Sequence, residues 1–375
     1  MLSYSLSAEL IQQLRDLNNA FAVMHGRLMQ YSEETKVALH RYAKISMIGA
    51  STRIENAVLT DAEIDWMDTV LTQNEKPDGF PINKEWIEDK LNKDKERSIE
   101  EVAGCRAMLT LIYSQAKELM PLSETTIRGL HQALLQYYPK ASSYLGRYKK
   151  ISNSVVETRQ STGQSRVVFE TAGAGPITDA AMRDLVIWYH EAAIKSPWSV
   201  AIACEFTYRF LAIHPFQDGN GRLGRGLFLL ALLQSPEEII STVTPYLAID
   251  RQIERRKAEY YVVLNRCSEG VYRHDPTHYH IEYFLQFMVK VLRASLDDID
   301  IYKKRFEACQ RLSESAHIIL ACFKDHPEVR LSIQQLVDIT HLPRRTIGHG
   351  LSTLTKENLI QKYGQKAGVR YQLTF

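Results

Sequence analysis

A polar loop between two apolar segments constrains the fold of this chain more than any other feature. The loop runs from His214 to Arg225 and reads HPFQDGNGRLGR. Residues 200–213 before it and 226–233 after it are apolar over helical lengths. Pro215 must end the first helix, because a proline ring cannot continue the backbone hydrogen-bond ladder. The sequence therefore predicts two buried helices with the polar loop wedged between them.

Helical spacing also dominates the rest of the chain. Leu10, Leu14 and Leu17, for example, recur at three and four residues and lie on one face of a helix. Only two stretches alternate as strands do, namely residues 148–170 and 361–373. We therefore expect a mainly α protein with one hairpin inside the core and a second hairpin at the C-terminus.

The pattern divides the chain into four expected parts. They are an N-terminal helical region (1–100) with a charged, exposed stretch near its end, a helical core (101–295), a polar linker helix (296–312) and a small C-terminal module (313–375). The total length is ample for one large core and a smaller one.

Composition gives no overall support for some classes of function. Lys and Arg number 46 against 44 Asp and Glu, so the formal charge of +2 gives no global argument for nucleic-acid or membrane binding. There is no uninterrupted apolar run of roughly 18 residues and no signal-like N-terminus. The five cysteines are scattered without a CxxC pair, which fits a reducing compartment. We therefore expect a cytoplasmic protein.

The central loop has the composition of a phosphate site. Gly219 and Gly221 allow backbone angles closed to other residues, so successive N–H groups can form an anion nest at the positive end of the next helix. Arg222 and Arg225 are three residues apart and project from the first turn of that helix. Their guanidinium groups match phosphate oxygens in geometry and charge.

Two more side chains of the loop add reactivity. Asp218 offers a hard oxygen ligand of the kind that Mg²⁺ takes beside phosphates. His214 can be neutral near pH 7 and can then take a proton from a hydroxyl. A base, a metal ligand, an anion nest and two arginines in one short loop predict a phosphoryl- or nucleotidyl-transfer site.

The loop resembles the Fic signature, HPFxDGNGRxxR, at every defined position, and the resemblance covers about residues 45–295. It implies a helical Fic fold and an adenylyltransferase that moves AMP from ATP to a Ser, Thr or Tyr of a target protein. It also implies that the ribbon at 148–170 is a flap, which holds the target peptide by strand addition.

The resemblance also implies a role for each residue of the motif. His214 is the base that deprotonates the target hydroxyl, and Asp218 holds Mg²⁺. Arg222 binds the phosphates near the bond that breaks, and Arg225 binds the γ-phosphate. The phosphate nest is expected to consist of Gly219, Asn220 and Gly221, with an added contact from the asparagine side chain. Phe216 is expected to anchor the loop by packing.

The expected adenine-binding segment lies downstream. Tyr260 and Tyr261 lie in a segment that resembles the part of the family near the base. Ser268 departs from the family pattern, because several relatives have an amide side chain there, and this leaves the choice of nucleotide open.

A short motif upstream resembles the inhibitory motif of the family, (S/T)xxxE(G/N). It reads Ser51-Thr-Arg-Ile-Glu55-Asn56. A carboxylate at Glu55 can pair with Arg225 and repel the γ-phosphate, so ATP binds in a pose unsuited to in-line attack. We therefore expect an inhibitory helix in the same chain, ahead of the core.

The C-terminal module resembles a winged helix. Residues 332–340 and 344–357 read as two helices joined by a turn, and 361–373 read as a two-stranded wing. Arg344 and Arg345 could face a DNA backbone, but nearby acidic residues dilute this patch. Binding to DNA and docking to a protein, including a second copy, both remain open.

The expected ligands are ATP and Mg²⁺, and the expected partner is a protein with a hydroxyl side chain. Self-modification, a homodimer and DNA contact remain open, and no membrane contact is expected. Two rival functions also remain. The same scaffold could remove AMP or transfer another group, since Glu55 could position water. Alternatively, the chain is a DNA-binding regulator whose core senses nucleotide, although a sensor needs neither His214 as a base nor Asp218.

Overall fold

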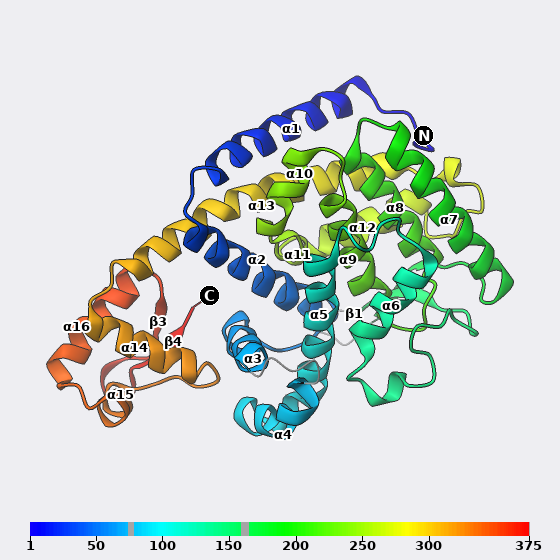
Figure 1. Cartoon of the computed structure of the whole chain (residues 1–375). Coiled ribbons are helices and arrows are strands. Elements are labelled where there is room, and N and C mark those ends of the chain that lie inside the picture. The colour runs from blue at the N-terminus through cyan, green and yellow to red at the C-terminus, as the bar shows by residue number, and fades with distance from the viewer. Residues whose placement is uncertain (74–78, 159–164, 375) are drawn as a thin grey trace.

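The computed structural model describes residues 1–73, 79–158 and 165–374 (Figure 1). It is mainly helical with two small hairpins, which confirms the fold class predicted from the sequence. The longer helices are α1 (Ala8–Leu28), α2 (Glu33–Ile54), α3 (Asp61–Gln73), α4 (Gly79–Leu91), α5 (Glu96–Gln115), α6 (Glu124–Leu135), α7 (Pro176–Lys195), α8 (Ser199–Ile213), α9 (Asn220–Leu233), α12 (Lys257–Ser268), α13 (Ile281–Gln310), α14 (Glu314–Asp325), α15 (Ile333–Thr340) and α16 (Arg344–Lys356).

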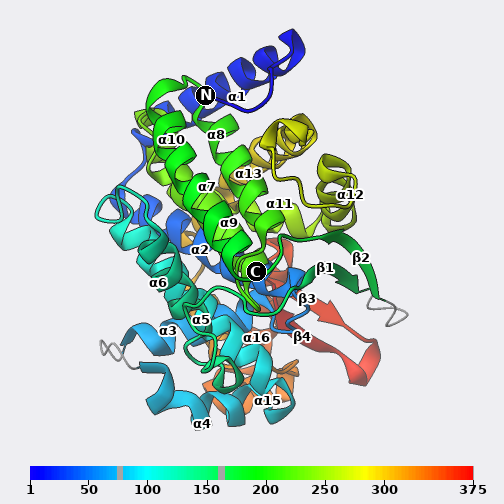
Figure 2. The same ribbon diagram turned by 90° about the vertical axis from the view of Figure 1, so that its right-hand side faces the viewer.

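Shorter elements complete the chain. The short helices are η1 (Lys93–Lys95), η2 (Pro139–Ala141), α10 (Glu238–Val243), η3 (Thr244–Tyr246), α11 (Ile249–Glu254), η4 (Pro276–His278) and η5 (Lys366–Gly368). Strands β1 (Ser154–Thr158) and β2 (Ser165–Glu170) form one antiparallel pair, and β3 (Ile360–Tyr363) and β4 (Arg370–Leu373) form the other. Figure 2 shows the first hairpin projecting from the helical body near α12.

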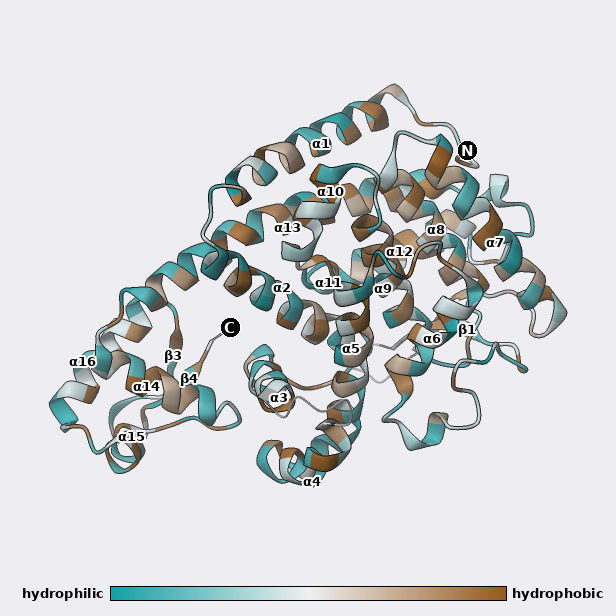
Figure 3. Cartoon of the chain, viewed as in Figure 1, coloured by the Kyte–Doolittle hydropathy of each residue, from teal (hydrophilic) through white to brown (hydrophobic). Residues whose placement is uncertain are grey.

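Helices α8 and α9 form the centre of the large core and pack against each other. Every residue from Val200 to Ile213 is buried, and so are most of those in α9. Burial of each large apolar side chain, such as Phe206 or Phe228, stabilises the fold by roughly 1.5–3 kcal/mol. Outer helices such as α1 bury only one stripe and carry hydrophilic residues elsewhere (Figure 3). This packing holds the ends of α8 and α9, and hence the loop between them, in place.

The N-terminal helices share this core with the rest of the chain. One hydrophobic cluster extends from Leu10 to Tyr302. Helix α5 continues through residue 100, where the sequence suggested a boundary between two regions. The charged stretch before residue 101, which was expected to be exposed, is partly buried, since Glu100 and Glu101 are buried. Their carboxylates pair with Lys84 and Arg97, respectively.

A second, smaller cluster lies in the C-terminal module and extends from Ile319 to Tyr371. The 30-residue helix α13 leads from the large core to this module, with its first half in the core (Figure 1). The module also touches the N-terminal helices, since Lys90 Nζ lies 3.0 Å from Glu328 Oε1. Among the described residues, no helix has both the length and the apolar character needed to cross a bilayer.

Two glycines give a matched test of the packing of α5 on α6. A Cβ atom at Gly104 would overlap the backbone carbonyl oxygen of Leu134, whereas a Cβ at Gly129 meets nothing within 4 Å. We expect Gly104→Ala to lower the free energy of unfolding by about 1–3 kcal/mol through overpacking. Gly129→Ala should raise it by roughly 0.5–1 kcal/mol, because alanine loses less entropy in a helix. Urea denaturation measures both, and equal stability of the two variants would contradict this packing.

Candidate active site

The loop between α8 and α9 begins with a backbone reversal at His214. Helix α8 ends at Ile213, and the His214 N–H donates to Phe210 O at 2.9 Å. His214 itself has φ 52°, in the left-handed region that non-glycine residues rarely adopt. Pro215 follows and prevents the helix from continuing. The reversal turns the imidazole out of the core toward a cavity that the start of α9 also lines.

The hydrogen bond of the His214 ring defines its tautomer. Nδ1 lies 3.3 Å from the carbonyl oxygen of Leu211, which can only accept, so Nδ1 carries the proton. Nε2 is then the acceptor nitrogen. Burial, together with the smaller effect of the nearby Lys149 ammonium, lowers the pKa of His214 to about 4. The ring is therefore neutral at pH 7 and able to accept a proton.

The next part of the loop is closed by Asn220. Its side-chain Oδ1 accepts from the Phe216 N–H at 2.9 Å, and its Nδ2 donates to Phe216 O at 2.8 Å. The asparagine is buried and lines the cavity, but both ends of its amide hold the loop together. The expected side-chain contact of Asn220 with phosphate stays a prediction, and its observed role is to fix the loop.

His131 supports the same loop from α6, and the sequence analysis missed it. Its Nε2 donates to the Asp218 carbonyl at 3.0 Å, and its Nδ1 accepts from the Gly146 N–H at 3.0 Å. Its ring stacks on Phe216, with centroids 3.9 Å apart and planes at 7°. Phe216 is fully buried, as expected of a packing anchor. A lone histidine on an apolar helix face gave no signal of this role.

Helix α9 starts with an open first turn. Gly219 is its N-cap residue and has φ 79°, which a side chain would strain. Gly219 has no side chain that could cap the helix, and the backbone N–H groups and the positive end of the helix dipole lie at the cavity. Gly219, Asn220 and Gly221 all line that cavity, which is the position expected of an anion nest.

Arg222 is the strongest indication of an anionic ligand. Its side chain is only 3% exposed. Within the part of the chain that the structure describes, its Nε and Nη1 atoms are buried and have no hydrogen-bond partner. Its Nη2 lies 3.6 Å from Asp218 Oδ1. Buried guanidinium N–H groups without an acceptor are costly, since each lost hydrogen bond to a charged group is worth roughly 1.5–3 kcal/mol. Arg222 lines the cavity, so a phosphate there would supply the missing acceptors.

Arg225, one turn later, is by contrast surrounded by acceptors. Its Nη2 donates to Glu55 Oε1 at 3.0 Å and to the Ser51 carbonyl at 2.9 Å, and its Nε lies 3.3 Å from Asp250 Oδ2. The carboxylates of Glu55 and Asp250 hold the pKa of Arg225 above its ordinary value, although burial acts against this. The structure thus brings together Glu55 and Arg225, which are 170 residues apart in the sequence.

The Glu55 carboxylate lies next to Gly221 in the first turn of α9. Glu55 is the C-cap residue of α2, and a Cβ added at Gly221 would overlap its Oε1 atom. The end of α2 is held there by Arg53, whose Nε and Nη2 donate to the two carboxylate oxygens of Glu254 in α11 at 2.7 and 3.0 Å. A carboxylate therefore occupies the positive end of α9 in this structure.

The cavity has a volume of about 290 Å³ and joins these groups. His214, Asp218 and Arg222 line it together with Tyr260 and Tyr261 of α12. The two tyrosines are largely buried, with rings 5.5 Å apart. Every residue that the sequence analysis assigned to the site lies in its lining, including Glu55 and Arg225. Ser268 is buried and does not belong to the lining.

A metal ion would need ligands from outside the protein. Among the described residues there is no group of three or more His, Cys, Asp or Glu side chains that could hold one. Asp218 is the carboxylate of the loop, and its Oδ1 accepts from the Gly219 N–H at 2.6 Å. Its side chain is 40% exposed and faces the cavity. One carboxylate beside phosphates suits Mg²⁺, which keeps waters and takes few protein ligands.

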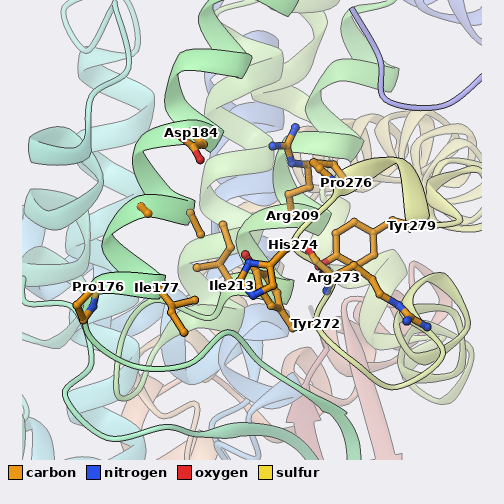
Figure 4. Close-up of a pocket in the computed structure, with 12 residues that line it drawn as sticks. Pro176, Ile177, Asp184, Arg209, Ile213, Tyr272, Arg273, His274, Pro276 and Tyr279 are labelled. Atoms are coloured by element: carbon orange, nitrogen blue, oxygen red, sulfur yellow. Dashed lines mark hydrogen bonds between the residues drawn. The ribbon is translucent and has the colours of Figure 1, made fainter.

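A second cavity, of about 310 Å³, lies between α7, α8 and the loop before α13 (Figure 4). Arg209 and Ile213 of α8 line it together with Tyr272 and His274. Arg209 is already paired with Glu205 at 3.4 Å. No residue of the central loop lines this cavity, so we assign the chemistry to the first one.

Comparison with known proteins places this loop in a family domain. Residues 121–232 match the model of the family described as Fic/DOC family. The matched region contains the loop from His214 to Arg225 and also His131. The chain therefore contains a Fic/DOC domain.

Several solved structures share the fold. A Fic family protein from Desulfovibrio desulfuricans G20 is 21% identical with a TM-score of 0.54, and the match covers 100% of this chain and 98% of that one. A Fic domain containing signaling protein from Bacteroides thetaiotaomicron is 22% identical with a TM-score of 0.55, covering 78% of this chain and 96% of that one. Fic-1 from C. elegans is 18% identical with a TM-score of 0.51, covering 78% and 71%.

The tautomer and burial of His214 predict its titration. We expect its imidazole to stay neutral through the neutral range and to gain a proton only as the pH falls through its lowered pKa of about 4. Because the unfolded state takes up this proton near 6.5, the folded state loses stability between pH 6.5 and 4. Nitrogen-15 NMR of labelled histidines measures the midpoint, and the His214→Gln variant identifies the signal. A midpoint at or above 6.5 would contradict the described environment.

Proposed function

We propose that the Fic/DOC domain of this chain is a protein adenylyltransferase, which moves AMP from MgATP to a Ser, Thr or Tyr hydroxyl of a target protein. The observation that carries the proposal is the shared cavity of His214 and Arg222. It combines a neutral imidazole with an acceptor Nε2 and a buried guanidinium whose Nε and Nη1 atoms have no hydrogen-bond partner among the described residues. Such a cavity suits transfer from a phosphate anhydride to a hydroxyl.

The proposed reaction is a single displacement. The target hydroxyl oxygen attacks the α-phosphorus of ATP and forms a new P–O bond. The bond between the α-phosphorus and the oxygen that bridges it to the β-phosphate breaks, and pyrophosphate leaves with that electron pair. The hydroxyl proton goes to Nε2 of His214, whose Nδ1 proton is held by Leu211 O at 3.3 Å. The net products are pyrophosphate, an AMP-modified protein and the proton that His214 takes up and then releases.

The remaining groups act by position and charge. The N–H groups at the start of α9 and the Arg222 guanidinium stabilise the negative charge on the phosphates without rearranging during the step. Asp218 would hold Mg²⁺, which supplies charge neutralisation to the phosphates when bound. Tyr260 and Tyr261 also line the cavity and would contact the nucleoside. Arg225 would bind the γ-phosphate once it is free of Glu55.

The Glu55–Arg225 pair supports autoinhibition. The carboxylate of Glu55 lies on the first turn of α9 and takes a donor of Arg225. An incoming γ-phosphate would need the same donor and would be repelled by the carboxylate. ATP would then bind in a pose in which the α-phosphate is not in line with the hydroxyl. Release would require movement of the end of α2 from α9.

The first test removes the Glu55 carboxylate. We expect Glu55→Gly to raise modification of the protein itself and of targets about tenfold to a hundredfold, since a partly shielded charge pair is worth ~1–3 kcal/mol. Glu55→Gln should release inhibition less completely, because the amide keeps the shape without the charge. Labelled ATP, gel autoradiography and mass spectrometry in a cell extract measure the transfer.

The matched control is the double variant Glu55→Gly/His214→Ala, which should lose transfer and keep its fold. Equal, strong labelling of the wild type and Glu55→Gly would show that Glu55 has no inhibitory role. Labelling that persists without His214 would show that another group is the base. A Glu55-dependent loss of AMP from a modified protein would instead favour the rival function, removal of AMP by water.

We infer a second function, DNA binding, for the C-terminal module, which has the helix–turn–helix and hairpin order of a winged helix. Helix α16 contains no Asp or Glu, and the exposed residues Arg345, His349, Ser352 and Lys356 are spaced to share one face. The module has eight Lys and Arg against five Asp and Glu. Figure 1 shows α16 at the outer end of the molecule, far from α8 and α9. This charge and position suit contact with a phosphate backbone.

Salt dependence tests this inference. We expect the full chain to bind duplex DNA with an affinity that falls steeply with added salt, and Arg345→Ala/Lys356→Ala to weaken binding and reduce the salt slope by about two. Arg15→Ala, an exposed change on α1, is the control and should have no effect. Fluorescence anisotropy over a salt series measures the slopes. Absence of binding at low salt would favour a protein-docking role for the module.

A further inference from the structure

Lys149 is a buried lysine beside the loop that the proposed mechanism does not yet use. It is 2% exposed, and its ammonium donates to Asn153 Oδ1 at 2.8 Å, Thr171 Oγ1 at 2.8 Å and the Ile213 carbonyl at 3.0 Å. All three acceptors are neutral. Burial without a carboxylate partner lowers the pKa of Lys149 to about 8. A buried ammonium is unfavourable without hydrogen bonds, so loss of any of the three acceptors would destabilise the charged form of Lys149.

Lys149 makes hydrogen bonds to the two residues that flank His214 in the chain. Its ammonium binds the carbonyl of Ile213, and its backbone N–H donates to the carbonyl of Pro215 at 2.8 Å. These are the residues immediately before and after His214. Because His214 has the strained φ of 52°, the hydrogen bonds on both sides help to hold that conformation. Lys149 thus supports the direction in which the imidazole points.

The same ammonium reaches both ends of the hairpin formed by β1 and β2. Asn153 immediately precedes β1, and Thr171 immediately follows β2. The Thr171 hydroxyl donates to the Asn153 carbonyl at 2.6 Å, which closes the base of the hairpin. Asn153 Nδ2 also donates to Phe216 O at 2.9 Å, in the loop that follows His214. One cluster therefore joins the base of the hairpin to the residues around the imidazole.

We propose that Lys149 is a positioning residue, which couples the position of the β1–β2 hairpin to the orientation of the His214 imidazole. This inference rests on the proposed function and on the flap role expected of the hairpin, in which a target strand pairs with it and offers its hydroxyl to Nε2. A strand added to β1 is held at a fixed register relative to Asn153. Through Lys149, that register also sets the distance between the hydroxyl oxygen and Nε2.

The charge of Lys149 has a second effect on the same ring. Three charged groups act on the His214 ring: Lys149 in the segment before the hairpin, Glu55 at the end of α2, and Asp218 in the loop. Arg222 and Arg225 of α9 line the same cavity. Burial is the largest cause of the lowered pKa of His214, and Lys149 lowers it further, whereas Glu55 and Asp218 raise it. Removing the ammonium should therefore raise the pKa of the imidazole.

The main experiment is Lys149→Met in the full chain that also carries Glu55→Gly. Methionine has a similar volume but no donor or charge. We expect kcat for target modification to fall about tenfold to a hundredfold, because a small misplacement of a reacting group has that effect, while KM for MgATP stays within about twofold. Lys150→Met is the control, since Lys150 is the exposed neighbour, and it should leave both values unchanged.

A second pair of variants keeps the inference testable if Lys149→Met does not fold. Thr171→Val removes the hydroxyl at the base of the hairpin with little change of shape, and Thr171→Ser retains it. We expect Thr171→Val to lower kcat in the same direction and Thr171→Ser to restore it. Equal activity of the valine and serine variants would overturn the coupling, because the hydroxyl would then have no part in it.

Two measurements are independent of AMP transfer. In Lys149→Met, nitrogen-15 NMR should show a raised titration midpoint for His214, and hydrogen exchange should be faster at residues 153–156 and 167–171. An unchanged midpoint together with unchanged exchange would overturn the inference. If the chain with Glu55→Gly transfers no AMP at all, the proposed function fails, but these two measurements still decide whether Lys149 positions the hairpin and the imidazole.

Discussion

Two guanidinium groups buried at the start of α9 are the constraint on which the surrounding structure depends. Both Arg222 and Arg225 are only 3% exposed, so each must find acceptors within the protein or from a ligand. Arg225 finds them in α2 and α11, through Ser51, Glu55 and Asp250. Arg222 lines the cavity with two atoms that no described residue satisfies. One arginine thus organises helix packing, and the other is left for an anion.

The loop before these arginines is held from several distant segments. His131 of α6 binds the Asp218 carbonyl, and Lys149 binds the carbonyls on both sides of His214. Asn220 closes the loop internally. A histidine in a left-handed conformation is unfavourable for a free chain. It persists here because the neighbouring elements supply hydrogen bonds to the backbone around it.

Much of the site could be predicted because its residues are close in sequence. His214, Asp218, Gly219, Gly221 and Arg222 lie within one loop, so their chemistry and spacing are visible without a structure. The residues that support the loop from other segments could not be predicted in this way. A lone histidine, a lone lysine or an aspartate within an apolar segment is usually structural, so nothing in the sequence distinguished His131, Lys149 or Asp250. The expected exposure of Glu100 and Glu101 was wrong, since a run of charge does not reveal which side faces a core.

The sequence by itself determined the mainly α fold, the two helices around the loop and the reactive groups within it, because helical periodicity and local spacing are short-range properties. Only the tertiary structure decided that Glu55 lies against Arg225 and over Gly221, and that Lys149 joins the hairpin to His214. These contacts span 170 and 64 residues. They depend on how whole helices pack, and packing depends on the shape and volume of many side chains together rather than on any local pattern.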